Sequence, residues 1–535
     1  MKKEMLPGLL GLALLANTTY GSVSMNETAT VKTYQLSAEG IELKNKIIEG
    51  QAFQVANLVG VDGFTGVRHD VGAPEIPVIR FFVEAKKASD IKVDVHAMKT
   101  DAIFALSHEL KPAMESVEKV SGATYKIERN LNYKTTDVDF EIAPSGSVRG
   151  HKQFMVTLYP VEYVGANNTL KISRTFSVSV KKIKDNKSDF ALEGMVFVVA
   201  SKFKNSPSLS QYMELKKAQG FEVSRIDLAN GVNADQIRAK IKSLYSTRSN
   251  LKYAVIVGDA ADAPGRTSTN IEGLTDHYFS AIDTNNYDTD INGPDISVGR
   301  FSVASEAQLA TVLKKYTRYI KGDFSSMSWT GNLSFLATDD RYEVAEGTHN
   351  YVVDSYTKNL GYLGTFPEVS QKGGDKLYAI TYNASTPEVM KSIAQGRSII
   401  DYSGHGANTF WDAPKVTQSD VRSLGTNSSL PFVISNSCIT GDYRVDESFA
   451  ETWQRHEWGA VMFWGSMDST YWDEDDILER RMFDGIFKGS LKTFGDITKN
   501  AMMELWKQYG GQERSTYYWE TYHMFGDPSI TLRLK

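Results

Sequence analysis

Residues 431–441 read Pro-Phe-Val-Ile-Ser-Asn-Ser-Cys-Ile-Thr-Gly, a short apolar run that ends in small residues around Cys438. A second run, Ser398-Ile-Ile-Asp-Tyr-Ser403, leads into Gly404-His405-Gly406. Continuous apolar runs of this length are typical of strands buried on both faces. Two such strands would deliver a thiol and an imidazole to the carboxyl edge of one sheet, where open α/β folds place their sites. That pair of groups can perform nucleophilic catalysis.

The same alternation of strand and helix extends outward from these runs, beginning at about Phe190. We expect strands at Gly194–Ala200, Tyr253–Asp259, Leu333–Ala337 and Gly459–Trp464. We expect helices at about Leu209–Lys217, Glu306–Lys321, His349–Asn359 and Pro387–Gln395. Strand–helix alternation with apolar strands predicts an α/β fold, in which helices flank a mostly parallel sheet.

Residues 22 to about 185 have a different pattern. Runs such as Val78–Val83, Gln153–Pro160 and Thr175–Val180 read as strands, and the last of these alternates apolar with small polar residues. The histidines of this part are scattered without metal-ligand spacing. The charged stretch Lys181–Asp189 then separates the two patterns and reads as a linker, with a polar hairpin as the alternative. This part of the chain is therefore expected to be β-rich and without catalytic groups.

The first 21 residues resemble an export signal. Lys2 and Lys3 precede an apolar stretch, Leu6–Ala16, and Thr19-Tyr20-Gly21 offers small residues for cleavage. This stretch is too short to span a bilayer, and no later run approaches that length, so we expect a secreted protein without a membrane span. The net charge of −6 gives no electrostatic support for nucleic-acid binding.

Cys438 is the single cysteine of the 535 residues, so no disulfide can form within the chain. A buried, inert cysteine is the alternative interpretation, but export and the neighbouring His-Gly strand end favour a reactive thiol. The nearest candidate base is His405, and His456 and His523 are weaker candidates. Backbone N–H groups around Gly406 and Cys438 could stabilise the oxyanion of an acyl-transfer reaction.

These motifs resemble the gingipain family of cysteine peptidases. Tyr402–Gly406 and Ser437–Gly441 look like the catalytic histidine and cysteine segments of that family. Further segments follow in family order: Val257–Asp259, Val298–Ser302, Ser448–Glu451 and Phe525–Ser529. Residues 465–475, Gly-Ser-Met-Asp-Ser-Thr-Tyr-Trp-Asp-Glu-Asp, look especially like the lysine-specific member. The resemblance covers about residues 190–535, and a weaker one to the family propeptide covers about 40–182.

The resemblance implies a caspase-like α/β fold and a role for each matched residue. Cys438 would be the nucleophile and His405 the general base and acid. Asp340 would orient the imidazole and stabilise its charged form, with the adjacent Asp339 as the alternative. No cofactor is required for this chemistry.

The resemblance also implies a specificity pocket for a basic side chain. Trp472 would cover the pocket, and Asp475 would pair with a substrate lysine, although three neighbouring acids compete for that role. Glu346 lies roughly where the arginine-specific relative carries its pocket acid. We therefore predict cleavage after basic residues, lysine first. The linker lysines, Lys181, Lys182, Lys184 and Lys187, are candidate points of self-processing.

The predicted division of the chain is a signal peptide at 1–21, a β-rich propeptide at 22–187 and a peptidase domain at 188–535. The peptidase domain would have subdomains at about 188–325 and 326–535. Residues 283–295 are dense in oxygen ligands, and Asp283, Asp288 and Asp290 form a candidate structural calcium loop, with a polar turn as the alternative.

The sequence thus predicts a secreted cysteine endopeptidase made as a zymogen. Its partners would be protein or peptide substrates and its own inhibitory propeptide. Two alternatives remain open. One is a sorting transpeptidase on the same fold, in which an amine resolves the acyl-enzyme. The other is a catalytically silent secreted binding protein.

Overall fold

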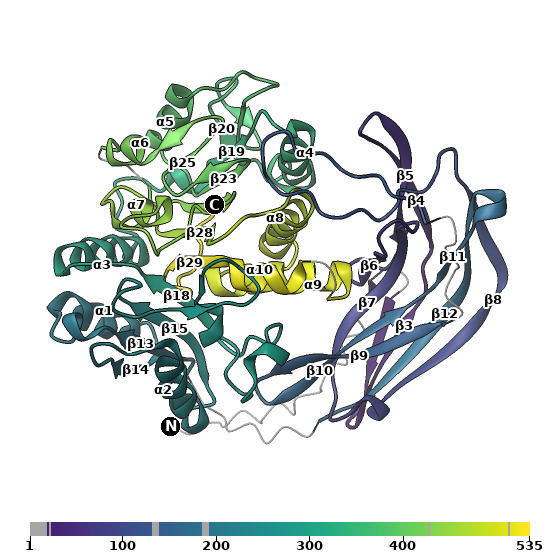
Figure 1. Cartoon of the computed structure of the whole chain (residues 1–535), viewed down its shortest axis with the longest axis horizontal. Helices are drawn as coiled ribbons and strands as arrows, with labels where there is room; N and C mark the ends of the chain where they lie inside the picture. Colours follow the sequence, from purple (N-terminus) through teal and green to yellow (C-terminus); the bar gives the residue numbers. More distant parts are fainter. Residues whose placement is uncertain (1–18, 21–22, 131–137, 184–191, 426–428, 512–513) are drawn as a thin grey trace, which may run out of the picture.

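The computed structural model describes residues 19–20, 23–130, 138–183, 192–425, 429–511 and 514–535. Most of the predicted signal peptide and of the predicted linker, at 1–18, 21–22 and 184–191, lies outside these ranges. A β-rich region up to residue 183 lies beside a helix-flanked sheet formed by residues from 192 onward (Figure 1). Within the described ranges, no helix has both the length and the apolar character needed to cross a membrane.

The N-terminal region consists of antiparallel strands with a core of their own. One sheet has the order β1-β2-β3-β12-β11 with β8 paired to β12, a second has the order β6-β7-β10-β9, and β4 pairs with β5. Side chains alternate in burial along β12, as expected for a sheet with one face in a core. The bounds are β1 Thr19–Tyr20, β2 Val23–Glu27, β3 Val31–Leu36, β4 Gly40–Ile48, β5 Gln51–Val59, β6 Thr65–Arg68, β7 Ile76–Glu84, β8 Ile91–Ala105, β9 Phe140–Val148, β10 His151–Leu158, β11 Val161–Val164 and β12 Thr169–Lys181.

The C-terminal region is built on a ten-stranded sheet of order β14-β13-β15-β18-β29-β28-β27-β23-β19-β22. All neighbours are parallel except β28 and β29, so two parallel blocks meet at one antiparallel seam. The predicted mostly parallel sheet is confirmed. The bounds are β13 Gly194–Val199, β14 Glu222–Asp227, β15 Leu251–Val257, β18 Ser297–Phe301, β19 Leu333–Ala337, β22 Asp375–Tyr378, β23 Ile399–Ser403, β27 Phe432–Asn436, β28 Met462–Ser466 and β29 Tyr522–Gly526.

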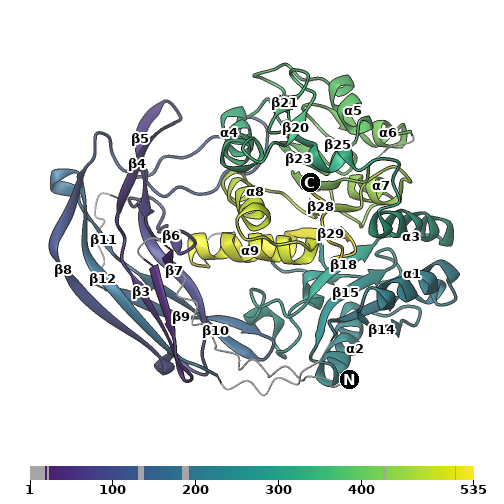
Figure 2. The ribbon, with the colours of Figure 1, turned by 180° about the vertical axis from the view of Figure 1, so that it is seen from behind.

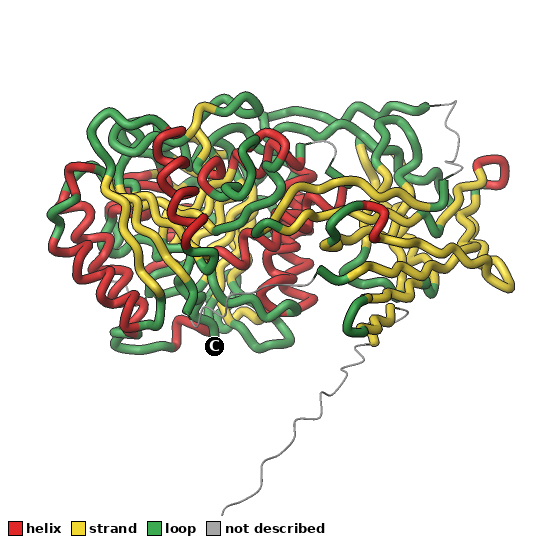
Figure 3. The backbone as a smooth tube through the Cα atoms, turned by 90° about the horizontal axis from the view of Figure 1, so that it is seen from below, coloured by secondary structure: helices red, strands yellow, loops and turns green. Residues whose placement is uncertain are grey.

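Helices cover both faces of this sheet, whereas the N-terminal region is almost entirely strand and loop (Figure 3). Successive residues of β23 point to opposite faces, so that Ile399 joins a core with α1, α3, α4, α8 and α9, and Ile400 joins a core with α5, α6 and α7. The helices are α1 Pro207–Ala218, α2 Ala234–Thr247, α3 Glu306–Lys321, α4 Tyr342–Val352, α5 Thr386–Ala394, α6 Gln418–Arg422, α7 Phe449–Arg455, α8 Trp472–Phe487, α9 Phe494–Tyr509 and α10 Ser515–Thr521.

One predicted helix has the wrong bounds. We expected a helix at His349–Asn359, but α4 begins at Tyr342 and gives way after Val352 to a π-helical turn at Val353–Thr357. The helix begins early because Arg341 adopts a left-handed conformation, with φ 47°, and so turns the chain directly from the end of β19 into α4. The predicted Leu333–Ala337 strand and Glu306–Lys321 helix have the observed bounds.

Within the described ranges the two regions touch at several places, and three of them bear on the site. A loop of the N-terminal region reaches across to α4 and α8 (Figure 1), and it carries Lys119. The β9–β10 hairpin meets the acidic loop at 283–295. The end of α9 extends toward the N-terminal strands (Figures 1 and 2), where Arg80 of β7 donates to two of its carbonyl oxygens. The N-terminal region therefore covers the edge of the sheet that carries Cys438 and His405.

Candidate active site

Three neighbouring strands bring the predicted catalytic residues to one sheet edge. β19, β23 and β27 are adjacent and parallel. Asp340, His405 and Cys438 each follow the carboxyl end of one of them. The site therefore arises from the topology that the two apolar runs predicted.

The turns that carry these residues are tightly constrained. A Cβ atom at Gly404 would lie 2.6 Å from Thr338 Cβ, and one at Gly406 would clash with Ser437 Oγ. Only glycine on both sides of His405 allows this approach of the β23 and β27 ends. Ile439, directly after Cys438, has φ 47°, which is costly for a β-branched residue and is typical of functional sites.

The imidazole of His405 lies between two oxygens. Its Nε2 is 2.8 Å from Asp340 Oδ2, and its Nδ1 is 2.9 Å from the backbone oxygen of Lys119. The ring also meets Trp472 edge to face, with centroids 5.6 Å apart. Asp340 rather than Asp339 contacts the ring, so Asp340 is placed to orient it.

The Cys438 thiol is buried beside Thr470. The Thr470 N–H donates to Sγ at 3.2 Å, and Sγ lies 3.7 Å from the Lys119 carbonyl oxygen. Burial raises the pKa of Cys438, against the opposing influence of the Thr470 hydrogen bonds and the Lys119 charge. The thiol in this state is therefore disfavoured as a thiolate.

Asp475, the acid expected in the specificity pocket, is buried near the start of α8. This carboxylate is only 1% exposed and accepts hydrogen bonds from the hydroxyls of Tyr518 at 3.0 Å and Tyr522 at 2.7 Å. Burial, with the Asp475 charge as the second cause, raises the pKa of both tyrosines well above the ordinary value. They therefore remain neutral donors to the carboxylate.

The side chain of Lys119, from the N-terminal region, lies against Asp475. Its Nζ lies 2.6 Å from Asp475 Oδ2, donates to the Asn436 carbonyl oxygen at 2.6 Å and lies 4.8 Å from the Trp472 ring centroid. An ion pair, a carbonyl acceptor and an aromatic face together satisfy a buried ammonium.

The backbone around Lys119 is extended and pairs with residues 470–472. The Lys119 N–H donates to the Thr470 oxygen at 2.8 Å, and the Trp472 N–H donates to the Val117 oxygen at 3.0 Å. Glu118 and Tyr471 form an antiparallel bridge. This pairing places the Lys119 carbonyl between His405 and Cys438.

Other candidate residues lie elsewhere. His456 ends α7, and His523 lies in β29, where its Nε2 accepts from the Asp276 N–H. Glu346 accepts from the backbone and hydroxyl of Thr381. The structure therefore gathers His405, Asp340, Cys438, Trp472 and Asp475 and leaves these three apart. The predicted oxyanion donors, the N–H groups of Gly406 and Cys438, remain a prediction, because the Lys119 oxygen accepts from His405 here.

The candidate calcium loop meets the β9–β10 hairpin of the N-terminal region. Asp283 accepts from the Ser147 hydroxyl and the Gly150 N–H, and Asp290 accepts from the Ser147 N–H. Burial raises the pKa of Asp290 to about 7, with Asp283 and Asp295 adding to the rise.

Part of this loop fits a cation. Asp283 Oδ1 and Asp290 Oδ2 are buried and have no hydrogen-bond partner within the described ranges. Oxygens of this kind suit calcium. Asp288 fits less well, because it is exposed and pairs with Arg266 at 2.9 Å. Calcium binding by this loop stays a prediction.

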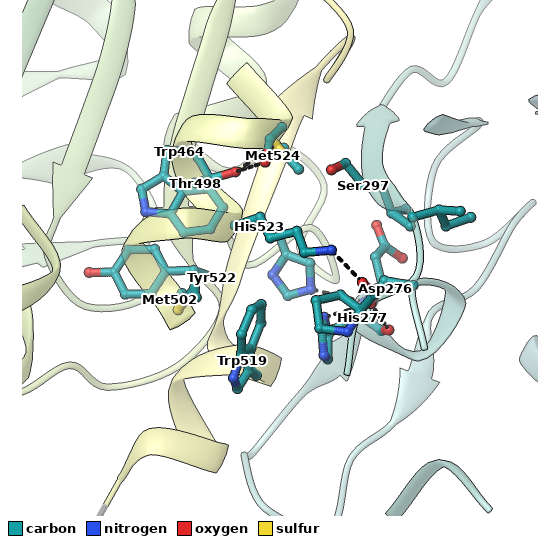
Figure 4. Close-up of a pocket in the computed structure, with 16 residues that line it drawn as sticks. Asp276, His277, Ser297, Trp464, Thr498, Met502, Trp519, Tyr522, His523 and Met524 are labelled. Atoms are coloured by element: carbon teal, nitrogen blue, oxygen red, sulfur yellow. Dashed lines mark hydrogen bonds between the residues drawn. The ribbon is translucent and has the colours of Figure 1, made fainter. Parts of the chain in front are cut away.

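A small cavity of about 50 Å³ lies behind the pocket, around His277, Trp464, Trp519, Tyr522 and His523 (Figure 4). Burial lowers the pKa of both histidines to about 4, so they are neutral near pH 7. Tyr522 joins the cavity to the pocket, because its ring lines the cavity and its hydroxyl contacts Asp475. The cavity is large enough to hold water.

Sequence reasoning missed Lys119, Thr470 and Asn436. Many lysines precede the catalytic region, and no local pattern distinguishes Lys119 from the others. Asn436 and Thr470 contribute backbone atoms, which residue identity does not reveal.

The family model described as peptidase family C25 matches residues 192–533, well over half of the chain. The chain therefore belongs to peptidase family C25, and the predicted gingipain resemblance is confirmed. The matched range also coincides with the helix-flanked sheet.

Curated relatives extend the similarity into the N-terminal region. Lys-gingipain HG66 of Porphyromonas gingivalis is 23% identical over an alignment that covers 98% of this chain and 34% of the relative. Gingipain R1 of the same organism is 22% identical, with 86% of this chain and 50% of the relative covered. The chain thus spans about a third to half of the length of these relatives.

Solved structures support the fold. The crystal structure of the Arg-specific cysteine proteinase gingipain R has a TM-score of 0.56 at 22% identity, covering 66% of this chain and 80% of that one. A complex of gingipain R pro- and mature domains from Porphyromonas gingivalis has a TM-score of 0.54 at 22% identity, covering 64% and 79%. The predicted caspase-like α/β class is confirmed.

Proposed function

We propose that this chain is a secreted cysteine endopeptidase that cleaves after lysine and is held inactive by its own N-terminal region. The observation that carries the proposal is the pose of Lys119. Its ammonium pairs with Asp475 at 2.6 Å, while its carbonyl oxygen lies 2.9 Å from His405 Nδ1 and 3.7 Å from Cys438 Sγ. A substrate lysine before a scissile bond would pair its ammonium with Asp475 in the same way and would bring its carbonyl carbon to the Cys438 sulfur.

The proposed reaction is acyl transfer through a thioester. The Cys438 thiolate attacks the carbonyl carbon of the bound lysine. The bond from that carbon to the next nitrogen breaks, and His405 protonates the departing amine. Asp340 holds the imidazole in place, and the N–H groups of Gly406 and Cys438 stabilise the oxyanion. Water, activated by His405, then hydrolyses the acyl-enzyme.

Lysine preference follows from the pocket floor. Asp475 is buried, so an apolar side chain would leave its charge unpaired at a cost of several kcal/mol. The Lys-gingipain name of one relative agrees with this assignment, whereas the gingipain R relatives bear the name of an Arg-specific enzyme. We assign lysine because the pocket accommodates the Lys119 side chain with three contacts to its ammonium.

Latency follows from the same contacts. In the assembled chain Cys438 is buried, with the Lys119 carbonyl oxygen 3.7 Å from its sulfur, and burial raises the pKa of the thiol. A His405 ring that donates its Nδ1 proton to the Lys119 carbonyl is not free to take the thiol proton. Departure of the N-terminal region would remove both obstacles. The named complex of pro- and mature domains is consistent with such an arrangement in a relative.

Replacement of Cys438 by alanine tests the mechanism. We expect Cys438→Ala to lower kcat/KM for lysyl peptides by at least about 1,000-fold, with the Tm of the chain retained. The matched control is Ser437→Ala, which changes the neighbouring small residue. Cleavage by Cys438→Ala at the parent rate would refute the cysteine mechanism.

A further inference from the structure

A second cluster of reactive side chains lies beneath the specificity pocket. His349 of α4, Asp401 of β23 and Glu479 of α8 are each 0% exposed, and one ligand atom from each lies within 4.8 Å of the others. His349 Nε2 is 3.2 Å from Glu479 Oε1 and 3.7 Å from Asp401 Oδ2. The reaction proposed above uses none of these groups.

Five of the six polar side-chain atoms of this cluster have no hydrogen-bond donor or acceptor outside the cluster. Both ring nitrogens of His349, both oxygens of Asp401 and Oε1 of Glu479 are buried without a hydrogen-bond partner in the part of the chain that the structure describes. Buried polar groups are almost always satisfied, and two carboxylates buried together are costly without a cation. A bound cation would satisfy all three residues at once.

We propose that His349, Asp401 and Glu479 bind one zinc ion, which fixes α4, β23 and α8 to one another. Ligands held about 2.0–2.2 Å from a tetrahedral zinc lie about 3.3–3.6 Å apart. The distances from His349 Nε2 to Glu479 Oε1 and to Asp401 Oδ2, 3.2 and 3.7 Å, bracket that range. One imidazole and two carboxylates also neutralise a dication.

The ligand set favours zinc over calcium. Calcium takes six to eight oxygen ligands, whereas this cluster offers one nitrogen and few oxygens in a fully buried place. Asn436 offers a further ligand atom for the ion. Its Nδ2 donates to Glu479 Oε2 at 2.9 Å, and its Oδ1 is buried and has no hydrogen-bond partner among the described residues. Water or this amide oxygen would complete four-coordination.

The ion would preorganise the specificity pocket. Glu479 lies one helical turn after Asp475 on α8, and Asn436, which contacts Glu479, also supplies the carbonyl that accepts from the Lys119 ammonium. β23 carries Asp401 and ends next to His405. The zinc site is a positioning site, and its existence does not depend on the proposed protease activity.

Metal content of the full chain tests the site. The parent for all measurements is Cys438→Ala, which prevents self-cleavage and removes the single thiol as a competing ligand. After purification from zinc-supplemented medium without chelators, we expect about one zinc per chain by mass spectrometry. Glu479→Gln and Asp401→Asn should each lower that content at least about fivefold. The matched control, Glu451→Gln, alters another fully buried glutamate and should retain the zinc.

A second measurement decides the case if the variants do not fold. The parent chain, stripped with phenanthroline and given cobalt(II) alone, should develop the visible absorption bands of a tetrahedral cobalt site, and stripping should lower its Tm by about 5 °C or more. Less than about 0.1 zinc per chain together with no cobalt bands would overturn the proposal, and a proton shared by the two carboxylates would explain the cluster. Zinc retained in full by a folded Glu479→Gln chain would also overturn it.

Discussion

At the scale of single residues, the ion pair between Lys119 and Asp475 indicates how a substrate lysine would be selected. We expect Asp475→Asn in the processed enzyme to lower kcat/KM for lysyl peptides by about 100- to 1,000-fold, because a buried ammonium loses its counter-charge. Steady-state kinetics with lysyl and uncharged peptides measure the change in preference.

The neighbouring acids provide the control for this substitution. Asp476 carries the same charge, but its carboxylate pairs with Arg480 at 2.8 Å on the other side of the helix turn. Asp476→Asn should leave lysine preference within about threefold of the parent. Equal losses in both variants would mean that the acidic helix start, and not Asp475, selects the substrate.

Removal of the Lys119 side chain should expose the pocket in the full-length chain. We expect Lys119→Ala to react with a peptidyl-lysine chloromethyl ketone at least about tenfold faster than the parent, because the probe's lysine no longer competes with a tethered one. Lys126→Ala is the matched control, since that side chain is 80% exposed. Labelling at equal rates in all three chains would contradict the inhibitory role of Lys119.

Part of the site is visible in the sequence for a physical reason. His405 and Cys438 follow continuous apolar strands, and burial on both faces leaves the strand end as the place where a polar side chain can act. Asp340 was harder to predict, because its approach to His405 depends on the left-handed turn at Arg341. Lys119 could not be predicted from local pattern, since it lies 319 positions before Cys438 in the sequence.

At the scale of elements, periodicity predicted strands and amphipathic helices better than helix starts. The Glu306–Lys321 helix was correct, because Ser305 caps it and one apolar face repeats along it. The helix expected at His349–Asn359 was wrong, because α4 has no side-chain cap and begins where the backbone reverses. The starts of these two helices thus have different physical causes: a side-chain cap for α3 and a backbone turn for α4.

The junction between β7 and α9 makes an element-scale prediction. Arg80 donates to the carbonyl oxygens of Lys507 and Gln508, each at 2.9 Å, and so satisfies orphan acceptors at the end of α9. Arg80→Met should lower the free energy of unfolding of the Cys438→Ala chain by about 2–4 kcal/mol, because these buried carbonyls lose a charged donor. Urea titration measures the loss, and hydrogen exchange should rise at residues 505–509.

A substitution at a second arginine distinguishes loss of the α9 cap from loss of a positive charge. Arg129 of the same region pairs with Glu109 at 3.0 Å, and its side chain is 39% exposed. Arg129→Met should change the free energy of unfolding by less than about 1 kcal/mol. A similar loss in both variants would show that capping of α9 is not the cause.

At the scale of the whole molecule, burial of acidic groups between the two regions makes stability depend on pH. Glu474 of α8 is 0% exposed and accepts a hydrogen bond from Ser116 of the N-terminal region. Burial, reinforced by Asp473, raises the pKa of Glu474 from 4.5 to about 8. Burial also raises the pKa of Asp290 and of Asp295, which meet the β9–β10 hairpin, to about 7. All three groups bind their protons more tightly in the assembled chain than in the unfolded one.

The sign of the pH effect follows from these shifts. A carboxyl group whose folded pKa exceeds its unfolded value contributes stability that is complete below the unfolded pKa and is lost as pH rises through the folded one. For Glu474 the window is therefore about pH 4.5 to 8, and the effect is at most about 5 kcal/mol. We expect the Tm of the Cys438→Ala chain to fall between pH 5 and pH 9, and Glu474→Gln to flatten that fall. Glu214→Gln, at a side chain 69% exposed, should leave the slope unchanged, and parallel curves for all three chains would exclude Glu474 as a source of the pH dependence.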